Sequence, residues 1–241
     1  MKRLLMIIFA VILFSLPVFA DSYEELEESG QIVEVDMENE LPLYIRAGVG
    51  LKIERLQLDL DKINGLLAAA DVDFSALDET MMLYGIEGVG GVRNGNIYGA
   101  YFLNGRNRSR GANGERVELS LTYGGLIYQR GIYMKKNTDI SIGTGMGYGR
   151  SRLELLHYKV DATKDGILGA TGTTLEKSFL LLEPSINFHQ QLTPIIGLDF
   201  SVGYLMTHDL DGGWSLSGHE LEDSLDGFEG GSVSLRVNFG M

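Results

Sequence analysis

The stretch SVSLRVNFGM, Ser232 to Met241, alternates between apolar and polar side chains until its last two residues. Its valines, leucine and phenylalanine share one parity, and its serines, arginine and asparagine share the other, so a strand formed here has one apolar and one polar face. The segment IIGLDFSVGYLMT, Ile195 to Thr207, repeats the pattern. A period of two over such lengths predicts β-strands.

The same alternation recurs along the chain after Pro42. It is clear at 117–123, 139–148 and 180–189, and weaker at 43–50, 80–88 and 96–103. Together with the two segments quoted above, these make about eight strands, an even number. The sequence therefore predicts an all-β fold.

The connections between these strands fall into two classes that alternate. Short turns are predicted at 93–95, which contains the hairpin signal Asn94-Gly95, and at 135–138 and 190–194. Long connections are predicted at 51–79, 104–115, 159–172 and 208–230. This order is typical of an up-and-down meander with turns at one end and loops at the other, so we predict a closed antiparallel up-and-down β-barrel of about eight strands.

One segment departs from the period of two. In LQLDLDKINGLLAAAD, residues 56–71, apolar side chains follow helical spacing from Leu60 to Ala70. Asp59 is the predicted N-cap, with Leu58 and Ile63 placed as a hydrophobic staple. We predict one short helix after the first strand, packed either inside the barrel or over its opening.

The N-terminus carries the pattern of a secretory signal peptide. Lys2 and Arg3 precede an apolar run that ends in small residues, which predicts cleavage after Ala20. We therefore divide the chain into a signal peptide (1–20), an acidic flexible segment (21–42) and a β-barrel domain (43–241). The formal net charge of −13 argues against nucleic acid as a partner, and the absence of cysteine excludes disulfides and cysteine-based metal sites.

Alternation alone does not distinguish a membrane barrel, apolar outside, from a soluble one, apolar inside. The signal peptide and the alternating connection lengths favour the membrane. Tyr148 and Tyr204 each lie about nine or ten residues after a short turn, close to the length of a membrane-crossing strand, and Phe188 and Phe239 lie towards the opposite end, which predicts an aromatic ring at each interface. The polar rows mix charges of both signs, as suits a narrow lumen. The charged residues placed in the lumen are Arg46, Glu87, Glu118, Asp139, Glu183, Asp199 and Arg236.

In these strands and connections the chain resembles the small bacterial outer-membrane β-barrels, the eight-stranded OmpA-like and OmpX-like architectures, from about Leu43 to Met241. The resemblance implies location in the outer membrane, with the lipid bilayer as partner. One departure is the C-terminus, where Phe239 is followed by two further residues instead of ending the chain.

The alternating glycines of DISIGTGMGYGR, 139–150, do not form a nucleotide-binding loop. The fingerprint G-x-G-x-x-G would need glycine where Tyr148 stands. Because Gly143, Gly145, Gly147 and Gly149 share one face of a strand, we predict that they make room for Arg236 or for the helix containing Ile63 and Leu66.

No constellation of catalytic or metal-binding residues is visible. His157 and His189 are placed near opposite ends of the barrel, without catalytic partners, and the acidic loop 208–230 lacks EF-hand spacing. We therefore predict a non-catalytic protein without cofactor or metal.

One basic cluster lies in the predicted loop NGRNRSRGANGER, 104–116: Arg106, Arg108, Arg110 and Arg116. These arginines have two candidate partners, the phosphates of a surface glycolipid and the acidic loop 208–230 of the same chain. We predict an outer-membrane barrel with a structural, surface-contact or adhesion role. A soluble secreted or periplasmic barrel that binds an apolar ligand and a small channel are the alternatives, and the oligomeric state is left open.

Overall fold

A computed structural model describes residues 45–70, 74–111, 114–159, 169–210, 214–216, 219–220 and 227–240. The predicted signal peptide and acidic segment lie outside these residues. The elements in chain order are β1 (Ile45–Gln57), α4 (Asp61–Ala69), β2 (Thr80–Val92), β3 (Asn96–Arg110), β4 (Arg116–Lys135), β5 (Thr138–Lys159), β6 (Gly169–Thr193), β7 (Ile196–Asp209), β8 (Ser215–Leu216), β9 (His219–Glu220) and β10 (Glu229–Gly240).

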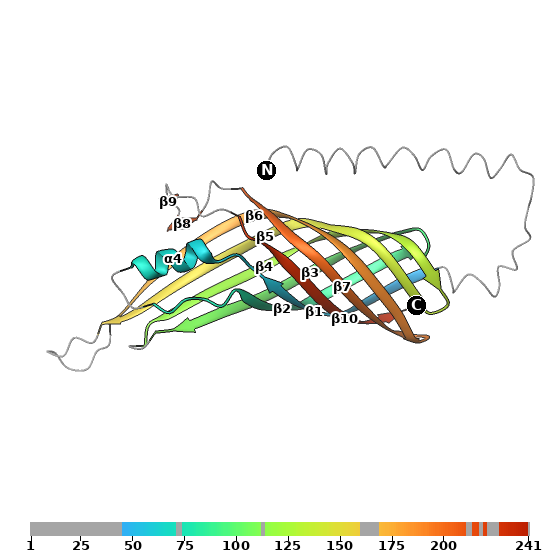
Figure 1. Ribbon diagram of the computed structural model, residues 1–241, viewed down its shortest axis with the longest axis horizontal. Coiled ribbons are helices and arrows are strands. Elements are labelled where there is room, and N and C mark those ends of the chain that lie inside the picture. Colours follow the sequence, from blue (N-terminus) through green and yellow to red (C-terminus); the bar gives the residue numbers. More distant parts are fainter. Residues whose placement is uncertain are drawn as a thin grey trace, which may run out of the picture. The chain divides into compact units, whose positions relative to one another are not determined.

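Eight of these strands form a closed antiparallel barrel (Figure 1). Strands β1 to β6 each pair with the next strand in sequence, β7 pairs with β10, and β10 pairs with β1 and closes the ring. The two-residue strands β8 and β9 form a small hairpin on β6. The predicted up-and-down barrel with one short helix after the first strand is confirmed.

The two ends of the barrel differ. The turn end carries the short turns at 93–95, 136–137 and 194–195 and the end of β10. The opposite end, called the loop end here, carries α4 and the far ends of β5 and β6 (Figure 1). Strands β4, β5 and β6 have 20, 22 and 25 residues, well beyond the 9–11 that cross a bilayer, so this side of the wall continues past the membrane.

Three predicted connections are shorter in the structure than predicted. The connection predicted at 51–79 loses residues 51–57, which belong to β1. Residues 104–110 belong to β3, and β4 begins at Arg116, so the connection predicted at 104–115 is mostly strand. The connection predicted at 159–172 is also shorter than predicted, because β6 begins at Gly169.

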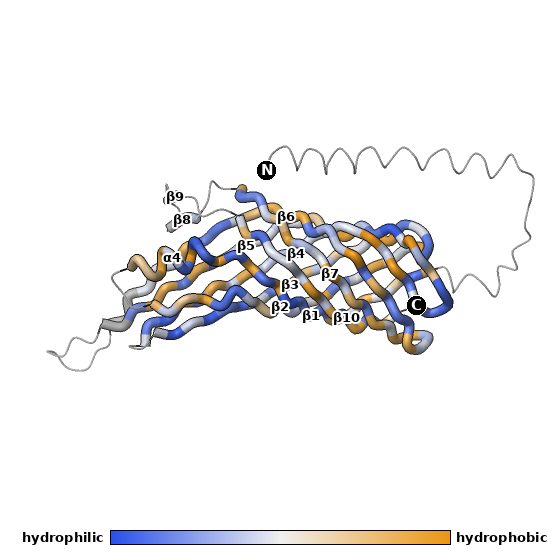
Figure 2. Tube along the Cα trace, viewed as in Figure 1, coloured by the Kyte–Doolittle hydropathy of each residue, from blue (hydrophilic) through white to orange (hydrophobic). Residues whose placement is uncertain are grey.

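The outer face between the two ends is a band of exposed apolar side chains. Figure 2 shows hydrophobic and hydrophilic residues alternating along the strands. Tyr148, Tyr204, Phe188 and Phe239, the predicted aromatic ring residues, are 41–55% exposed and face outward. Such a band is unfavourable in water and typical of a barrel that crosses a membrane. It includes Ile45, Val49, Leu51, Ile53, Tyr84, Ile86, Phe102, Leu126, Ile142, Met146, Ile186, Phe200, Val202, Val233 and Leu235.

The interior of the turn-end half is polar and densely paired. Asp199 accepts hydrogen bonds from Arg46, Arg236 and His189, and Arg236 also donates to Glu87 over 2.7 Å. A second group joins Lys52 to Glu54 and Glu87. The predicted lumenal residues Arg46, Glu87, Asp139, Glu183, Asp199 and Arg236 are all buried on the inner face.

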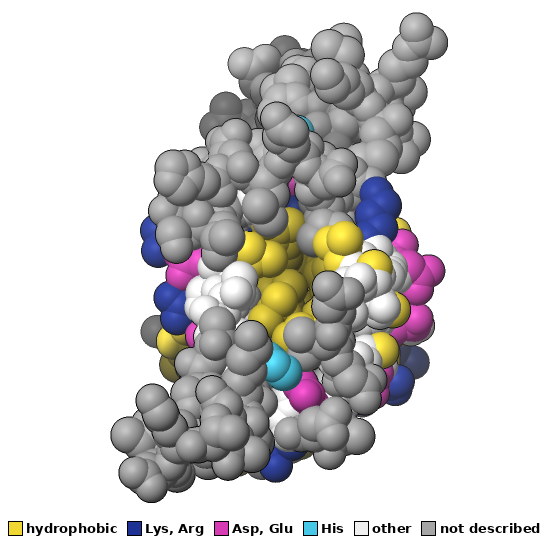
Figure 3. Space-filling model, turned by 90° about the vertical axis from the view of Figure 1, so that its left-hand side faces the viewer, with side chains coloured by type: hydrophobic (Ala, Val, Ile, Leu, Met, Phe, Trp, Pro, Cys, Tyr) yellow, Lys and Arg dark blue, Asp and Glu magenta, His cyan; other side chains and the backbone are white. Residues whose placement is uncertain are grey.

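The interior of the loop-end half is apolar instead. Val117, Leu119, Leu121 and Tyr123 point inward, so the polar residues between them, including Glu118, point outward. The placement of Glu118 in the lumen was therefore wrong. Apolar side chains inside the barrel, as predicted for the soluble alternative, are found in this half alone. Figure 3 shows hydrophobic side chains gathered in the mouth of the barrel at this end.

The short helix α4 packs on this apolar interior. It begins at Asp61 after the capping position Leu60, so Asp59 is not the N-cap, although its carboxylate accepts the Asp61 N–H over 3.1 Å. Ile63 and Leu67 are buried with Leu58 in the core cluster. No helix among the residues described is long and apolar enough to cross a membrane.

The glycines of β5 make room inside the barrel, but not for the predicted neighbours. A Cβ atom added at Gly145 would lie 3.2 Å from the Tyr101 hydroxyl, and one at Gly149 would overlap the ring of Phe179. Large aromatic side chains from β3 and β6 therefore occupy the space, rather than Arg236 or α4.

Candidate anion-binding groove

The outward face of β3 to β6 at the loop end carries a grid of polar residues fixed by strand register. Arg106 on β3 lies opposite Ser120 on β4, Ser120 lies opposite Arg152 on β5, and Arg152 lies opposite Glu176 on β6. One step nearer the apolar band, the corresponding row is Asn104, Thr122, Arg150 and Ser178. Both rows point away from the barrel interior because their residues share the parity of the outward aromatics Phe102 and Tyr148.

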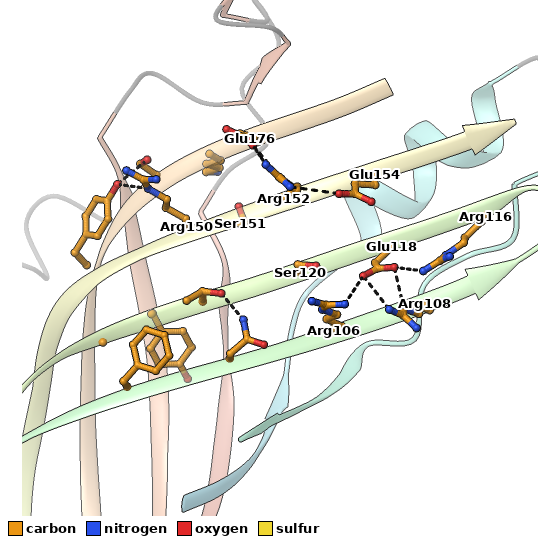
Figure 4. A pocket seen from close by; sticks show the side chains of 18 residues that line it. Arg106, Arg108, Arg116, Glu118, Ser120, Arg150, Ser151, Arg152, Glu154 and Glu176 are labelled. Atoms are coloured by element: carbon orange, nitrogen blue, oxygen red, sulfur yellow. Dashed lines mark hydrogen bonds and ion pairs between the residues drawn. The ribbon is translucent and has the colours of Figure 1, made fainter. Parts of the chain in front are cut away.

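A groove of about 1010 Å³ lies over this grid (Figure 4). Five outward arginines and three outward glutamates line it, which leaves an excess of positive charge on a strongly acidic protein. These outward charged residues are Arg106, Arg108, Arg116, Arg150, Arg152, Glu118, Glu154 and Glu176, and the inward Lys177 also contributes to the lining.

Glu118 is the centre of the first cluster. Arg108 donates to its carboxylate through Nε at 2.8 Å and Nη2 at 3.3 Å, Arg116 also donates to it, and Arg106 lies 3.7 Å away. The Glu118 side chain is only 7% exposed, although it points outward, which places it beneath the arginines. Desolvation acts to raise the pKa of this carboxyl, but the hydrogen bonds from Arg108 and Arg116 outweigh it and lower the pKa.

Arg152 is the centre of the second cluster. It donates to Glu176 through Nε at 2.9 Å and Nη2 at 2.6 Å, and its Nη1 lies 3.6 Å from Glu154. Arg150, one step nearer the band, folds back on Tyr148, with Nε 3.0 Å from the tyrosine hydroxyl. The two clusters come from neighbouring strands and face one groove (Figure 4).

Three of the four predicted site residues meet in this groove. Arg106, Arg108 and Arg116 line it, whereas Arg110 lies beyond it at the end of β3. Arg150 and Arg152 also line the groove but were not among the predicted site residues. The signal was available, because both continue the outward parity of Tyr148 along β5.

The acidic loop proposed as an alternative partner for the arginines lies largely outside the described residues. One of its described carboxylates, Asp209, pairs with Lys177 over 2.7 Å instead. The Lys177 side chain is buried beside Trp214 and Phe228 on the inner face, whereas the arginines point outward.

The two histidines examined for catalysis occupy opposite ends of the interior. His189 Nδ1 lies 2.9 Å from Asp199 within the lumenal network. His157 lies at the loop end with Nδ1 3.6 Å from Glu115. Within the described part of the chain, no group of three or more acidic or histidine side chains is arranged to hold a metal ion.

A polar cavity in the barrel interior has a volume of about 20 Å³ and is lined by Lys52, Glu87, Tyr101 and Glu183 among others. This is room for about one water molecule. Side chains, not a water column, therefore occupy this part of the interior, as the narrow lumen of an eight-stranded barrel favours.

No protein-family model matches the chain, and no curated protein sequence matches it significantly. Among solved structures, Ail of Yersinia pestis aligns at 12% identity over 81% of this chain and 96% of that chain, with a TM-score of 0.40. Neisserial surface protein A aligns at 10% identity over 82% and 99%, with a TM-score of 0.47. The protease OmpT of Escherichia coli aligns at 8% identity over 83% and 96%, with a TM-score of 0.33.

Proposed function

We propose that this barrel is a non-catalytic outer-membrane protein that makes contacts at the cell surface, and that its arginine groove binds the anionic headgroup of a surface glycolipid. The barrel is then oriented in the outer membrane with its loop end facing the cell exterior. The extended wall of β4, β5 and β6 then stands clear of the membrane and offers a surface for contact or adhesion.

The observation that carries the proposal is the position of the groove. Along β3, Arg106 follows the outward aromatic Phe102 after one intervening outward residue, and along β5, Arg150 directly follows Tyr148 on the same face. Aromatic residues of membrane barrels lie at the interface, so the arginines lie at the level of lipid headgroups. Arginine binds phosphate through two parallel hydrogen bonds, which suits a phosphorylated headgroup.

The packed interior supports a contact role over the channel alternative. The turn-end half is closed by ion pairs around Asp199 and the loop-end half by the apolar core. The exposed apolar band likewise favours a membrane barrel over the soluble alternative.

Replacing Arg106 and Arg108 together by alanine tests the glycolipid contact. We expect binding of the full protein to vesicles that contain a phosphorylated glycolipid to weaken at least tenfold, because hydrogen bonds between charged groups contribute about 1.5–3 kcal/mol each. Arg55→Ala is the matched control, since Arg55 is an exposed outward arginine of β1 that does not line the groove. Equal binding by the double variant and the wild type would contradict the proposal.

A further inference from the structure

The groove has a floor of small side chains between two walls of arginine. Gly124, Thr122 and Ser120 form the outward row of β4 beneath it. Arg106 and Arg152 flank Ser120 in direct register on β3 and β5, and Figure 4 shows them on either side of it. Because neighbouring strands lie about 4.8 Å apart, these two arginines start about 10 Å from one another across the floor.

Both flanking arginines keep much of their surface open. The Arg106 side chain is 58% exposed and lies 3.7 Å from Glu118, farther than the other two arginines of that cluster. The Arg152 side chain is 54% exposed. A phosphoryl group lying over Ser120 would meet a guanidinium on each side and a hydroxyl beneath, and its three oxygens match this set of donors.

The outward residues also follow a fixed chemical order away from the apolar band. On β3 the order is Phe102, Asn104 and Arg106, and the opposite residues on β4 are Gly124, Thr122 and Ser120. On β3 and β4, apolar surface therefore gives way first to amide and hydroxyl groups and then to Arg106, whereas β5 already carries Arg150 at the level of Asn104 and Thr122. Two residues of strand cover about 7 Å, and the tilt of a barrel strand reduces this to about 5 Å of height. Arg106 lies two such steps beyond Phe102, so it lies about 10 Å above that aromatic residue.

We infer that the groove selects a phosphorylated sugar headgroup on an acylated lipid, with the phosphoryl group over Ser120 between Arg106 and Arg152 and the sugar hydroxyls against Asn104 and Thr122. The inference rests on the proposed glycolipid contact and names its ligand class. An anionic phospholipid carries its phosphate close to its acyl chains. It would place that phosphate at the level of Asn104 and Arg150, below the pair formed by Arg106 and Arg152.

Binding to nanodiscs of defined composition tests the selection. Three probes are compared in a neutral phospholipid background: an acylated disaccharide with one phosphate, the same disaccharide without phosphate, and phosphatidylglycerol at equal surface charge. We expect the full protein to bind the phosphorylated disaccharide at least tenfold more tightly than either other probe. Equal affinity for phosphatidylglycerol would overturn the inference, since the groove would then respond to charge alone.

Ser120→Phe tests the position of the phosphoryl group without changing any charge. Phenylalanine suits a strand and fills the floor, so we expect the preference for the phosphorylated disaccharide to disappear. Gln57→Phe, at an exposed outward position of β1, is the matched control. An unchanged preference in Ser120→Phe would overturn the inference.

A second variant keeps the inference testable if Ser120→Phe does not fold. Arg106→Ala combined with Arg152→Ala leaves the small floor intact, and we expect it to bind phosphorylated and unphosphorylated disaccharide equally. A retained preference would overturn the inference. The Arg106 and Arg108 double variant separates the two proposals. If it binds glycolipid like the wild type, the proposed glycolipid contact is wrong. If it binds weakly but the wild type shows no preference for the phosphorylated disaccharide, only the inferred ligand class is wrong.

Discussion

Glu118 acts at the residue scale as the internal counter-ion of the groove, because it places one negative charge among three guanidinium groups. Its hydrogen bonds with Arg108 and Arg116 lower its pKa below the usual 4.5, against the effect of desolvation. A carboxyl whose pKa is lower in the folded state stabilises that state above its unfolded pKa, and this stabilisation is lost as pH falls through the folded pKa. Protonation of Glu118, which releases the arginines, therefore requires a lower pH than protonation of a glutamate in the unfolded chain.

We expect Glu118→Gln to remove part of the acid sensitivity of the fold and to strengthen anion binding at neutral pH. The lost stabilisation is less than about 1 kcal/mol, since the arginine partners are 31–58% exposed and screened by solvent. Unfolding by urea at pH 7 and pH 3 measures the difference. Glu154→Gln is the control, because Glu154 lies farther, at 3.6 Å, from its arginine. Identical pH dependence in the wild type and Glu118→Gln would contradict this role.

The misplacement of Glu118 shows what residue parity can and cannot predict. Parity correctly grouped Glu118 with Ser120 and Thr122, and separated them from Val117 and Leu119. It does not say which group faces the interior, because the interior changes from polar to apolar along the same strand. The change from a polar to an apolar interior depends on where the strand leaves the membrane. That position is set by the assembled barrel and cannot be read from the alternation of a single strand.

At the scale of the element, the alternating glycines give β5 an almost bare inner face over its central part. Tyr101 and Phe179 fill the space that this face leaves. The two aromatic side chains explain the glycines as packing features of the strand. The sequence located the bare face but not its neighbours, because the neighbours depend on how β3 and β6 are placed around the barrel.

We expect Gly145→Val to destabilise the barrel by about 1–3 kcal/mol, because its side chain would crowd the Tyr101 ring. The measurement is the temperature at which the folded band disappears on an unboiled gel. Thr144→Val is the control, since the neighbouring position has the opposite parity and a side chain of similar size. A variant barrel as heat-resistant as the wild type would show that the bare face is not needed for packing.

The loop ends of the strands were the least predictable elements. From Asn104 to Arg110 both faces of β3 carry polar or small residues, so the hydropathy alternation that marks a strand is absent. The segment is nevertheless a strand because its backbone pairs with β4 as far as Arg110 opposite Arg116. Pairing with a neighbour of clear alternation thus extends a strand beyond the point where its own sequence predicts it.

At the scale of the whole molecule, the apolar outer band and the filled interior give a joint expectation. We expect the protein to fractionate with outer membranes, to change gel mobility on boiling, and to show no discrete conductance in planar bilayers. The band requires a membrane, and the ion pairs and apolar core occupy the lumen. Recovery in the soluble fraction would contradict the membrane placement, and reproducible single-channel steps would contradict the filled interior.

The global architecture was predictable because period, turn chemistry and connection length all agree on one barrel. The groove was only half predictable: Arg106, Arg108 and Arg116 stood out as a cluster in sequence, whereas Arg152 is separated from them by a hairpin. Only the register of β4 with β3 and β5 brings Arg106 and Arg152 to the two sides of Ser120.

The reversal of polarity inside the barrel has a consequence for how the strands find their positions. In a uniform barrel, a slip of two residues keeps every side chain on its proper face and is opposed only weakly. Here, a slip of two residues moves the boundary between the polar and apolar interior. Strand β4 would then bring Leu121 to the place where the Tyr123 hydroxyl donates to Glu54, or Gln129 to the place of Ile127 in the apolar core. The boundary between polar and apolar interior residues therefore fixes the position of each strand along the barrel axis. It disfavours strands shifted by two residues, in addition to strands whose faces are exchanged.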